Sequence, residues 1–168
     1  MANPMSTLGI IHTVVSVIPV IAGIYSFSKY GAIVPKSDAG RLYLITIVLS
    51  VVTSFGLSST GGFNPGHAIG ILTLLAIAFS FAIAKLGWFG RLNRYLQVLS
   101  MSFTYFLLMV PAINETLSRV PPSNPIGNGP ESPPVQATTA AWAVIFLIGI
   151  CWQAWSMHRH PVSGAQAV

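Results

Sequence analysis

Charged side chains are scarce in this chain of 168 residues. Only 7% of the residues are charged, whereas 53% are apolar and the mean hydropathy is +0.71. A soluble domain carries roughly 25% charged residues, so this chain lacks the groups that would cover a surface in water. The composition therefore excludes an ordinary soluble domain and indicates an integral membrane protein.

Carboxylates and cysteine are scarcer still. Asp38, Glu115 and Glu131 are the only acids, and Cys151 is the only cysteine. One cysteine excludes an internal disulfide and a multi-cysteine metal site. The lack of acids within the long apolar runs argues against an ion-coupled pump. The eight Lys and Arg residues stand singly in short connections, so we do not expect nucleic acid as a partner.

Long apolar runs dominate the sequence instead. Uncharged windows of about 20 residues predict transmembrane helices. Five such windows occur, at residues 8–27, 42–57, 67–84, 95–113 and 138–157. We therefore expect an all-α bundle of five transmembrane helices in a single domain over residues 1–157, followed by a short tail over 158–168. The lipid bilayer is the expected surrounding, with other membrane proteins as further partners.

The cations indicate how such a bundle is oriented. With five crossings, one side carries Lys29, Lys36, Arg41, Lys85, Arg91, Arg94 and Arg159, and the other side carries Arg119. The positive-inside rule then places the amino terminus outside and the carboxyl terminus in the cytosol of a bacterial inner membrane. Trp142 is expected to anchor the helix of 138–157 near the outer interface.

The outer connection over residues 114–137 is rich in proline. It contains Pro121, Pro122, Pro125, Pro130, Pro133 and Pro134. Proline disrupts helix interiors, so we expect an extended link without regular helix. The alternative is a lid or a segment that docks a partner.

Polar and small residues recur at helical spacing inside the predicted spans. Four stripes result: His12, Ser16, Pro19, Gly23 and Ser26; Thr46, Ser50, Thr53 and Ser54; Gly66 and Gly70; and Gln97, Ser100 and Thr104. Helices in lipid associate through close packing at small residues and through polar contacts. We interpret the stripes as packing seams, with a hydroxyl-lined path for a small solute as the alternative.

The candidate site lies at the outer ends of the spans. His12 and His67 are expected at similar depth there, and the end of the fourth span adds the polar cluster of Asn114, Glu115 and Arg119. Two imidazoles on neighbouring helices suit a b-type haem. His12, His67 and Glu115 would instead match a three-ligand metal site. The structural alternative is that each histidine bonds a nearby carbonyl or lipid headgroup.

Several landmarks together resemble a family of small polytopic bacterial membrane proteins known as a domain of unknown function. The resemblance covers roughly residues 8–121. It rests on Gly40-Arg41-x-Tyr43, Gly61-Gly62-Phe63 followed by His67, Gly90-Arg91, and Ala112 with Glu115, Arg119 and Pro121. It implies a polytopic membrane protein and carries over no established chemistry.

No nucleophile-and-base constellation or phosphate-binding loop is recognisable in the sequence. The sequence therefore favours a non-enzymatic accessory or interaction protein with a polar pocket at its outer face, although catalysis is left open. The alternatives are an electron-transfer protein that binds haem b through His12 and His67, and a small-solute carrier.

Overall fold

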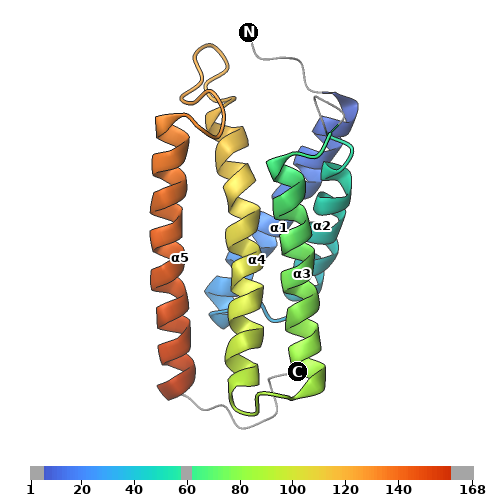
Figure 1. The fold of residues 1–168 in the computed structure, drawn as a ribbon, viewed down its shortest axis with the longest axis vertical. Coiled ribbons are helices and arrows are strands. Elements are labelled where there is room, and N and C mark those ends of the chain that lie inside the picture. The colour runs from blue at the N-terminus through green and yellow to red at the C-terminus, as the bar shows by residue number, and fades with distance from the viewer. Residues whose placement is uncertain (1–5, 58–61, 160–168) are drawn as a thin grey trace.

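The computed structural model describes residues 6–57 and 62–159, which form five α-helices and contain no strand (Figure 1). The helices are α1 (Thr7–Tyr30), α2 (Asp38–Ser54), α3 (Pro65–Leu86), α4 (Leu92–Leu117) and α5 (Pro133–Arg159). The expected all-α class is confirmed. The predicted tail beyond residue 159 and Gly61 of the resemblance lie outside the described residues.

Four helices are long and apolar enough to cross a membrane: α1, α3, α4 and α5. The helix α2 has 17 residues, which at 1.5 Å per residue gives about 25 Å, against about 30 Å for a hydrocarbon core. The helices therefore support a multi-pass membrane protein with four candidate spans. The helix α2, which corresponds to the second of the five predicted spans, is shorter than a full crossing requires.

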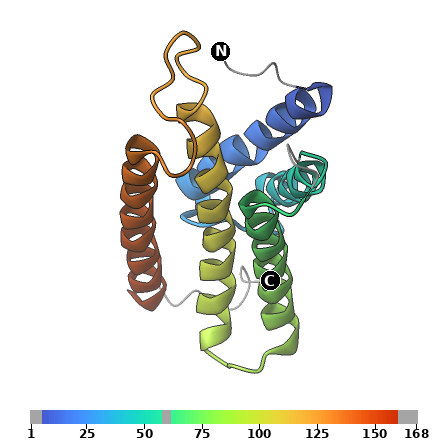
Figure 2. The same cartoon turned by 45° about the horizontal axis from the view of Figure 1, so that its top comes forward.

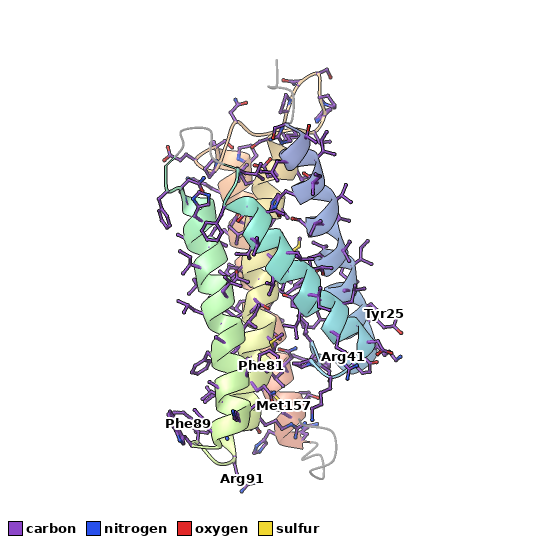
Figure 3. All side chains as sticks on the ribbon, turned by 90° about the vertical axis from the view of Figure 1, so that its right-hand side faces the viewer. Tyr25, Arg41, Phe81, Phe89, Arg91 and Met157 are labelled. Carbon is purple, nitrogen blue, oxygen red and sulfur yellow. The ribbon has the colours of Figure 1, made fainter. Side chains whose placement is uncertain are left out.

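Successive helices run in opposite directions, so the connections alternate between two ends of the bundle (Figure 1). The basic end contains residues 31–37, residues 87–91 and the last turn of α5. Arg41 and Arg91 both lie at this end in Figure 3. The proline-rich end contains residues 118–132 together with the start of α1 and of α3.

Neighbours in sequence are neighbours in space. The helices α1 and α2 pack along each other, α3 and α4 do the same, and α5 packs on α4. A smaller contact joins α2 to α3, and another joins α1 to α4. As Figure 2 shows, α2 lies between α1 and α3, and α1 crosses the bundle at an angle. The fold is thus two helical hairpins with a fifth helix added at one side.

Side-chain caps fix where the first three helices begin. Ser6 and Ser37 accept hydrogen bonds from the backbone N–H groups of Gly9 and Gly40. Asn64 forms a reciprocal capping box with His67. These bonds satisfy N–H groups that have no partner inside the helix. Local sequence therefore determines where these three helices begin: Ser-x-x-Gly for α1 and α2, and Asn-Pro-Gly-His for α3.

The helices on both sides extend into the connection over residues 114–137, which was expected to contain no regular helix. The helix α4 continues to Leu117, and α5 begins at Pro133 rather than at residue 138. Pro133 and Pro134 occupy the first turn of α5, where a missing backbone N–H costs nothing because it would have no helical partner. The irregular segment is therefore shortened to residues 118–132, which we call the proline-rich cap.

The proline-rich cap is not the extended link expected from its composition. The N–H of Gly127 donates to the carbonyl of Leu117 at 2.9 Å, and the N–H of Ile126 donates to the carbonyl of Val120 at 3.3 Å. The N–H of Gly129 also donates to the hydroxyl of Ser118 at 3.1 Å. The cap therefore folds back on the end of α4.

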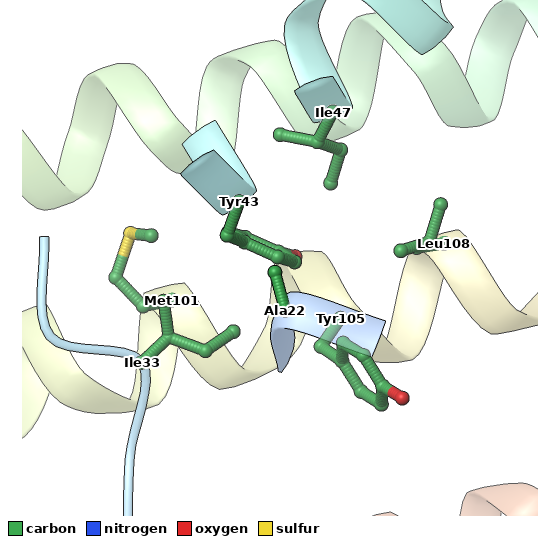
Figure 4. Close-up of a cluster of buried hydrophobic side chains, with 7 residues drawn as sticks. All are labelled: Ala22, Ile33, Tyr43, Ile47, Met101, Tyr105 and Leu108. Atoms are coloured by element: carbon green, nitrogen blue, oxygen red, sulfur yellow. The ribbon is translucent and has the colours of Figure 1, made fainter. Parts of the chain in front are cut away.

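The main hydrophobic core lies where the two hairpins meet. It contains Ala22, Ile33, Tyr43, Ile47, Met101, Tyr105 and Leu108 (Figure 4). These residues come from α1, from the connection after it, from α2 and from α4. Large apolar side chains also cover the outside of the bundle (Figure 3), as lipid-facing helices require.

Two glycines allow close approach within this core. A side chain at Gly23 would collide with the ring of Tyr105, and one at Gly40 would collide with the backbone of Val34. The small-residue stripe of α1 therefore packs inward as predicted. Gly66 does not belong to a packing seam, because it is exposed in the first turn of α3, whereas Gly70 packs on Val51.

Candidate functional site

The polar stripes of α1 and α2 meet in a row of hydrogen bonds that we call the polar seam: His12, Ser16, Ser50 and Thr53. The Nδ1 atom of His12 lies 2.9 Å from Oγ1 of Thr53, and the hydroxyls of Ser16 and Ser50 are 2.6 Å apart. All four side chains are at least partly buried between the two helices. Polar pairs of this kind hold helices together in lipid.

The proton positions in the polar seam follow from the surrounding acceptors. Thr53 donates its hydroxyl hydrogen to the carbonyls of Leu49 and Ser50, at 2.9 and 3.0 Å. Its oxygen is then left to accept from Nδ1–H of His12. The Nε2 atom of His12 consequently carries a lone pair, with the hydroxyl of Ser16 at 3.4 Å.

His67 is held more completely than His12. Its Nδ1 accepts from the backbone N–H of Asn64 at 3.3 Å, and its Nε2–H donates to the carbonyl of Ser54 at 3.2 Å. The ring stacks on Phe55 at 5.0 Å and meets Phe63 edge-on at 5.7 Å. Nε2 and the ring stacking of this buried histidine therefore hold the start of α3 against the end of α2, and Nδ1 caps α3 itself.

The two histidines reach the same level of the bundle from different helices. His12 contacts Thr53 and His67 contacts Ser54, which are consecutive residues of α2. The end of α2 thus stands between the two imidazoles. A haem held by His12 and His67 would have to occupy this space, and its iron would compete for His67 nitrogens that are already bonded to the backbone of Asn64 and of Ser54. The arrangement does not fit a haem between these two residues.

The metal set proposed from the sequence is not assembled. Among residues 6–57 and 62–159, no three His, Cys, Asp or Glu side chains come together in a group that could hold a metal ion. Glu115, the third member of that set, lies in the last turn of α4. Its carboxylate is bonded instead to Nε of Arg119 at 2.7 Å.

The polar cluster at the end of α4 combines an exposed ion pair with one buried atom. Glu115 and Arg119, four residues apart, form the ion pair, and both side chains are exposed. An exposed pair of this kind contributes about 0.2–1 kcal/mol. The Oδ1 atom of Asn114 is buried and has no hydrogen-bond partner among the described residues. The three side chains mark the junction between α4 and the proline-rich cap.

A second polar contact, at the basic end, was not predicted from the sequence. The amide of Gln153 in α5 donates to the carbonyl of Gly31 at 2.7 Å and accepts from the hydroxyl of Ser102 at 2.9 Å. Gln153 thereby joins α5 to α4 and to the end of α1. A glutamine inside an apolar run was the available signal, because a buried amide in lipid needs partners.

Trp142 also differs from its expected role. It lies well inside α5, donates from Nε1 to the carbonyl of Phe106 at 3.3 Å, and packs edge-on against Tyr105 at 6.1 Å. An interfacial anchor would instead lie near the helix end. Trp142 therefore attaches α5 to α4.

Comparison with known protein families, curated proteins and solved structures finds no match for this chain.

Proposed function

We propose that this chain is a non-enzymatic accessory protein of a bacterial inner membrane, which binds another membrane protein through its outer face. The basic connections at one end of the bundle support an orientation with the proline-rich cap outside. The family resemblance described above supports the bacterial membrane. Five crossings, with α2 shorter than the rest, keep the cap and the start of α1 on the same side.

The observation that carries this proposal is the folded apolar surface of the proline-rich cap. Val120 and Ile126 are 50% and 55% exposed, although the backbone bond between them orders the segment. Contiguous apolar patches that are exposed outside the membrane mark interaction sites, and we assign Val120 and Ile126 to such a patch. The ion pair of Glu115 and Arg119 lies beside this surface and provides a polar rim. The matching partner surface is an apolar patch with mixed charge around it.

The polar groups of the histidine region support the non-enzymatic part of the proposal. Nε2 of His67 and Nδ1 of His12 bond residues of α2, and Nδ1 of His67 bonds the N–H of Asn64 at the start of its own helix. The lone pair on Nε2 of His12 faces the hydroxyl of Ser16 at 3.4 Å. A general base or a metal ligand needs a free lone pair aimed at open space. The polar groups of the histidine region therefore serve to hold α1, α2 and α3 together.

Site-specific photo-crosslinking in intact cells tests the interaction. A photoreactive residue at Val120 is expected to give one discrete adduct with a membrane protein that mass spectrometry identifies. Ile126→Glu, introduced beside the probe, is expected to abolish that adduct. A probe at Ile21, which is 62% exposed in α1, serves as the lipid-facing control. No protein adduct at the cap, or an equal adduct at Ile21, would overturn the proposal.

A visible spectrum of the purified protein tests the haem alternative separately. We expect a colourless preparation. A Soret band that disappears in both His12→Ala and His67→Ala would replace the accessory role with an electron-transfer role.

A further inference from the structure

A cavity of about 260 Å³ lies between α1, α4 and α5. Its walls are mainly aromatic, with Phe27 from α1, Tyr105 from α4, and Trp142, Phe146 and Trp152 from α5. Gly149 forms part of the wall, and a side chain added there would meet no atom within 4 Å. The space is therefore open beside α5 and is not filled by the protein.

The polar side chains of Gln153, Ser102 and Tyr105 at this cavity already have partners inside the protein. The amide of Gln153 is bonded to Gly31 and Ser102, and Tyr105 donates to the carbonyl of Val20 at 3.3 Å. The cavity thus offers an occupant an apolar wall rather than new hydrogen bonds. Compact organic ligands fill pockets of about 300–1,000 Å³, so the size suits a slender chain better than a ring system.

The bilayer around the protein is the source of such a slender apolar chain. The spans of α1 and α5 bury only 17% and 6% of their apolar windows, so the rest of their surface faces the bilayer. These two helices border the cavity, and α5 makes its helix–helix packing on α4. An acyl chain can therefore reach the cavity from the side.

A cation lies below the cavity at the basic end. Arg159 follows Trp152 by seven residues, which places both on one face of α5, about 10 Å apart along its axis. The guanidinium stacks at 4.0 Å on the ring of Trp155. At the same end, the ammonium of Lys29 lies over the rings of Tyr25 and Tyr30 at 5.4 and 5.2 Å. Cations and aromatic rings in this arrangement match the headgroup level of a bilayer.

We propose that the cavity binds one acyl chain of an anionic glycerophospholipid, whose phosphate is held by Arg159. The chain lies against the aromatic wall beside Gly149, and the headgroup rests at the basic end. The site depends on the bundle being embedded in lipid and is independent of the partner bound by the proline-rich cap.

Native mass spectrometry of the full chain in detergent tests the site by titration with lipid. Dioleoyl phosphatidylglycerol is expected to bind as a single retained lipid, more tightly than dioleoyl phosphatidylcholine. Arg159→Gln is expected to weaken the binding of phosphatidylglycerol about fivefold, because one interfacial cation is lost. Gly149→Leu is expected to weaken the binding of both lipids about tenfold or more, because the leucine side chain fills the space that the acyl chain would occupy.

Matched variants control for general effects. Ala141→Leu adds the same side chain to an exposed position of α5, and Arg91→Gln removes an exposed cation from the same end. Both are expected to bind lipid as the unmodified protein does. Arg159 is exposed, so its replacement tests the site even where Gly149→Leu does not fold.

Three results would overturn the lipid site. The first is equal retention of the two lipids together with no effect of Arg159→Gln. The second is unchanged binding in a folded Gly149→Leu protein. The third is competition by glycerol phosphate, which has the phosphate but no chain, because the cavity would then play no part in binding.

Discussion

The hydroxyl of Tyr43 in α2 donates a hydrogen bond to Oγ1 of Thr104 in α4, across 2.8 Å of fully buried interior. The direction follows because Thr104 directs its own hydrogen to the carbonyl of Met101 at 2.7 Å. The bond connects the first helical hairpin with the second. It lies at the centre of the main hydrophobic core, where water cannot replace a lost partner.

Replacing Tyr43 with phenylalanine is expected to lower the free energy of unfolding by about 1 kcal/mol, because one interhelical hydrogen bond is lost in lipid. Thermal unfolding in detergent measures the change. Thr104→Val should have a similar effect, and the double variant should cost less than the sum. Fully additive effects would show that the two side chains do not interact.

Replacing His67 with alanine is expected to cost about 2 kcal/mol. The change removes the bond to Ser54, breaks the capping box with Asn64 and empties a space between two phenylalanine rings. His12→Ala should cost less, because that side chain is only half-buried and forms one short hydrogen bond. His158→Ala, at an exposed position, provides the control in the same unfolding assay. Equal stability of all three variants would contradict the structural role of the histidines.

Replacing Gly23 with alanine is expected to destabilise the protein by about 1–3 kcal/mol, because the added methyl group forces the ring of Tyr105 out of place. Gly149→Ala serves as the control, since its methyl group enters open space. Both changes lower backbone freedom in the unfolded chain alike, so the difference between them measures packing alone. A neutral Gly23→Ala would mean that α1 can move away from α4 at little cost.

Replacing Gln153 with leucine is expected to loosen α5 from the rest of the bundle, with a loss of about 1–2 kcal/mol, because the carbonyl of Gly31 is left without this partner. Hydrogen exchange should rise at the basic end of α5 and stay unchanged in α3. Gln136→Leu, at an exposed position of α5, should leave the exchange unaltered. The opposite pattern would show that Gln153 does not attach α5.

Long uncharged windows predicted the existence of the helices, and the helical spacing of small and polar residues predicted the inward face of α1 and α2. Both signals are local in the sequence. The residues at which the helices begin and end were harder to predict. Pro133 disrupts a helix interior but fits a first turn, and composition alone does not distinguish the two positions.

The partners of the polar side chains could not be predicted in the same way. Ser102 and Gly31 lie 51 and 122 residues from Gln153, so their meeting depends on which helices pack together. The position of α2 between His12 and His67 depends on the same packing. Spacing along the chain indicates a face of a helix but not the helix that it contacts.

Because almost every helix packs on its neighbour in the sequence, assembly can follow synthesis. Each helix that leaves the translocation machinery finds a partner already in the bilayer, and α5 arrives last at a prepared surface on α4. The contacts between helices distant in sequence then form mainly when the hairpin of α1 and α2 joins the hairpin of α3 and α4. A topology with mostly local contacts favours rapid folding.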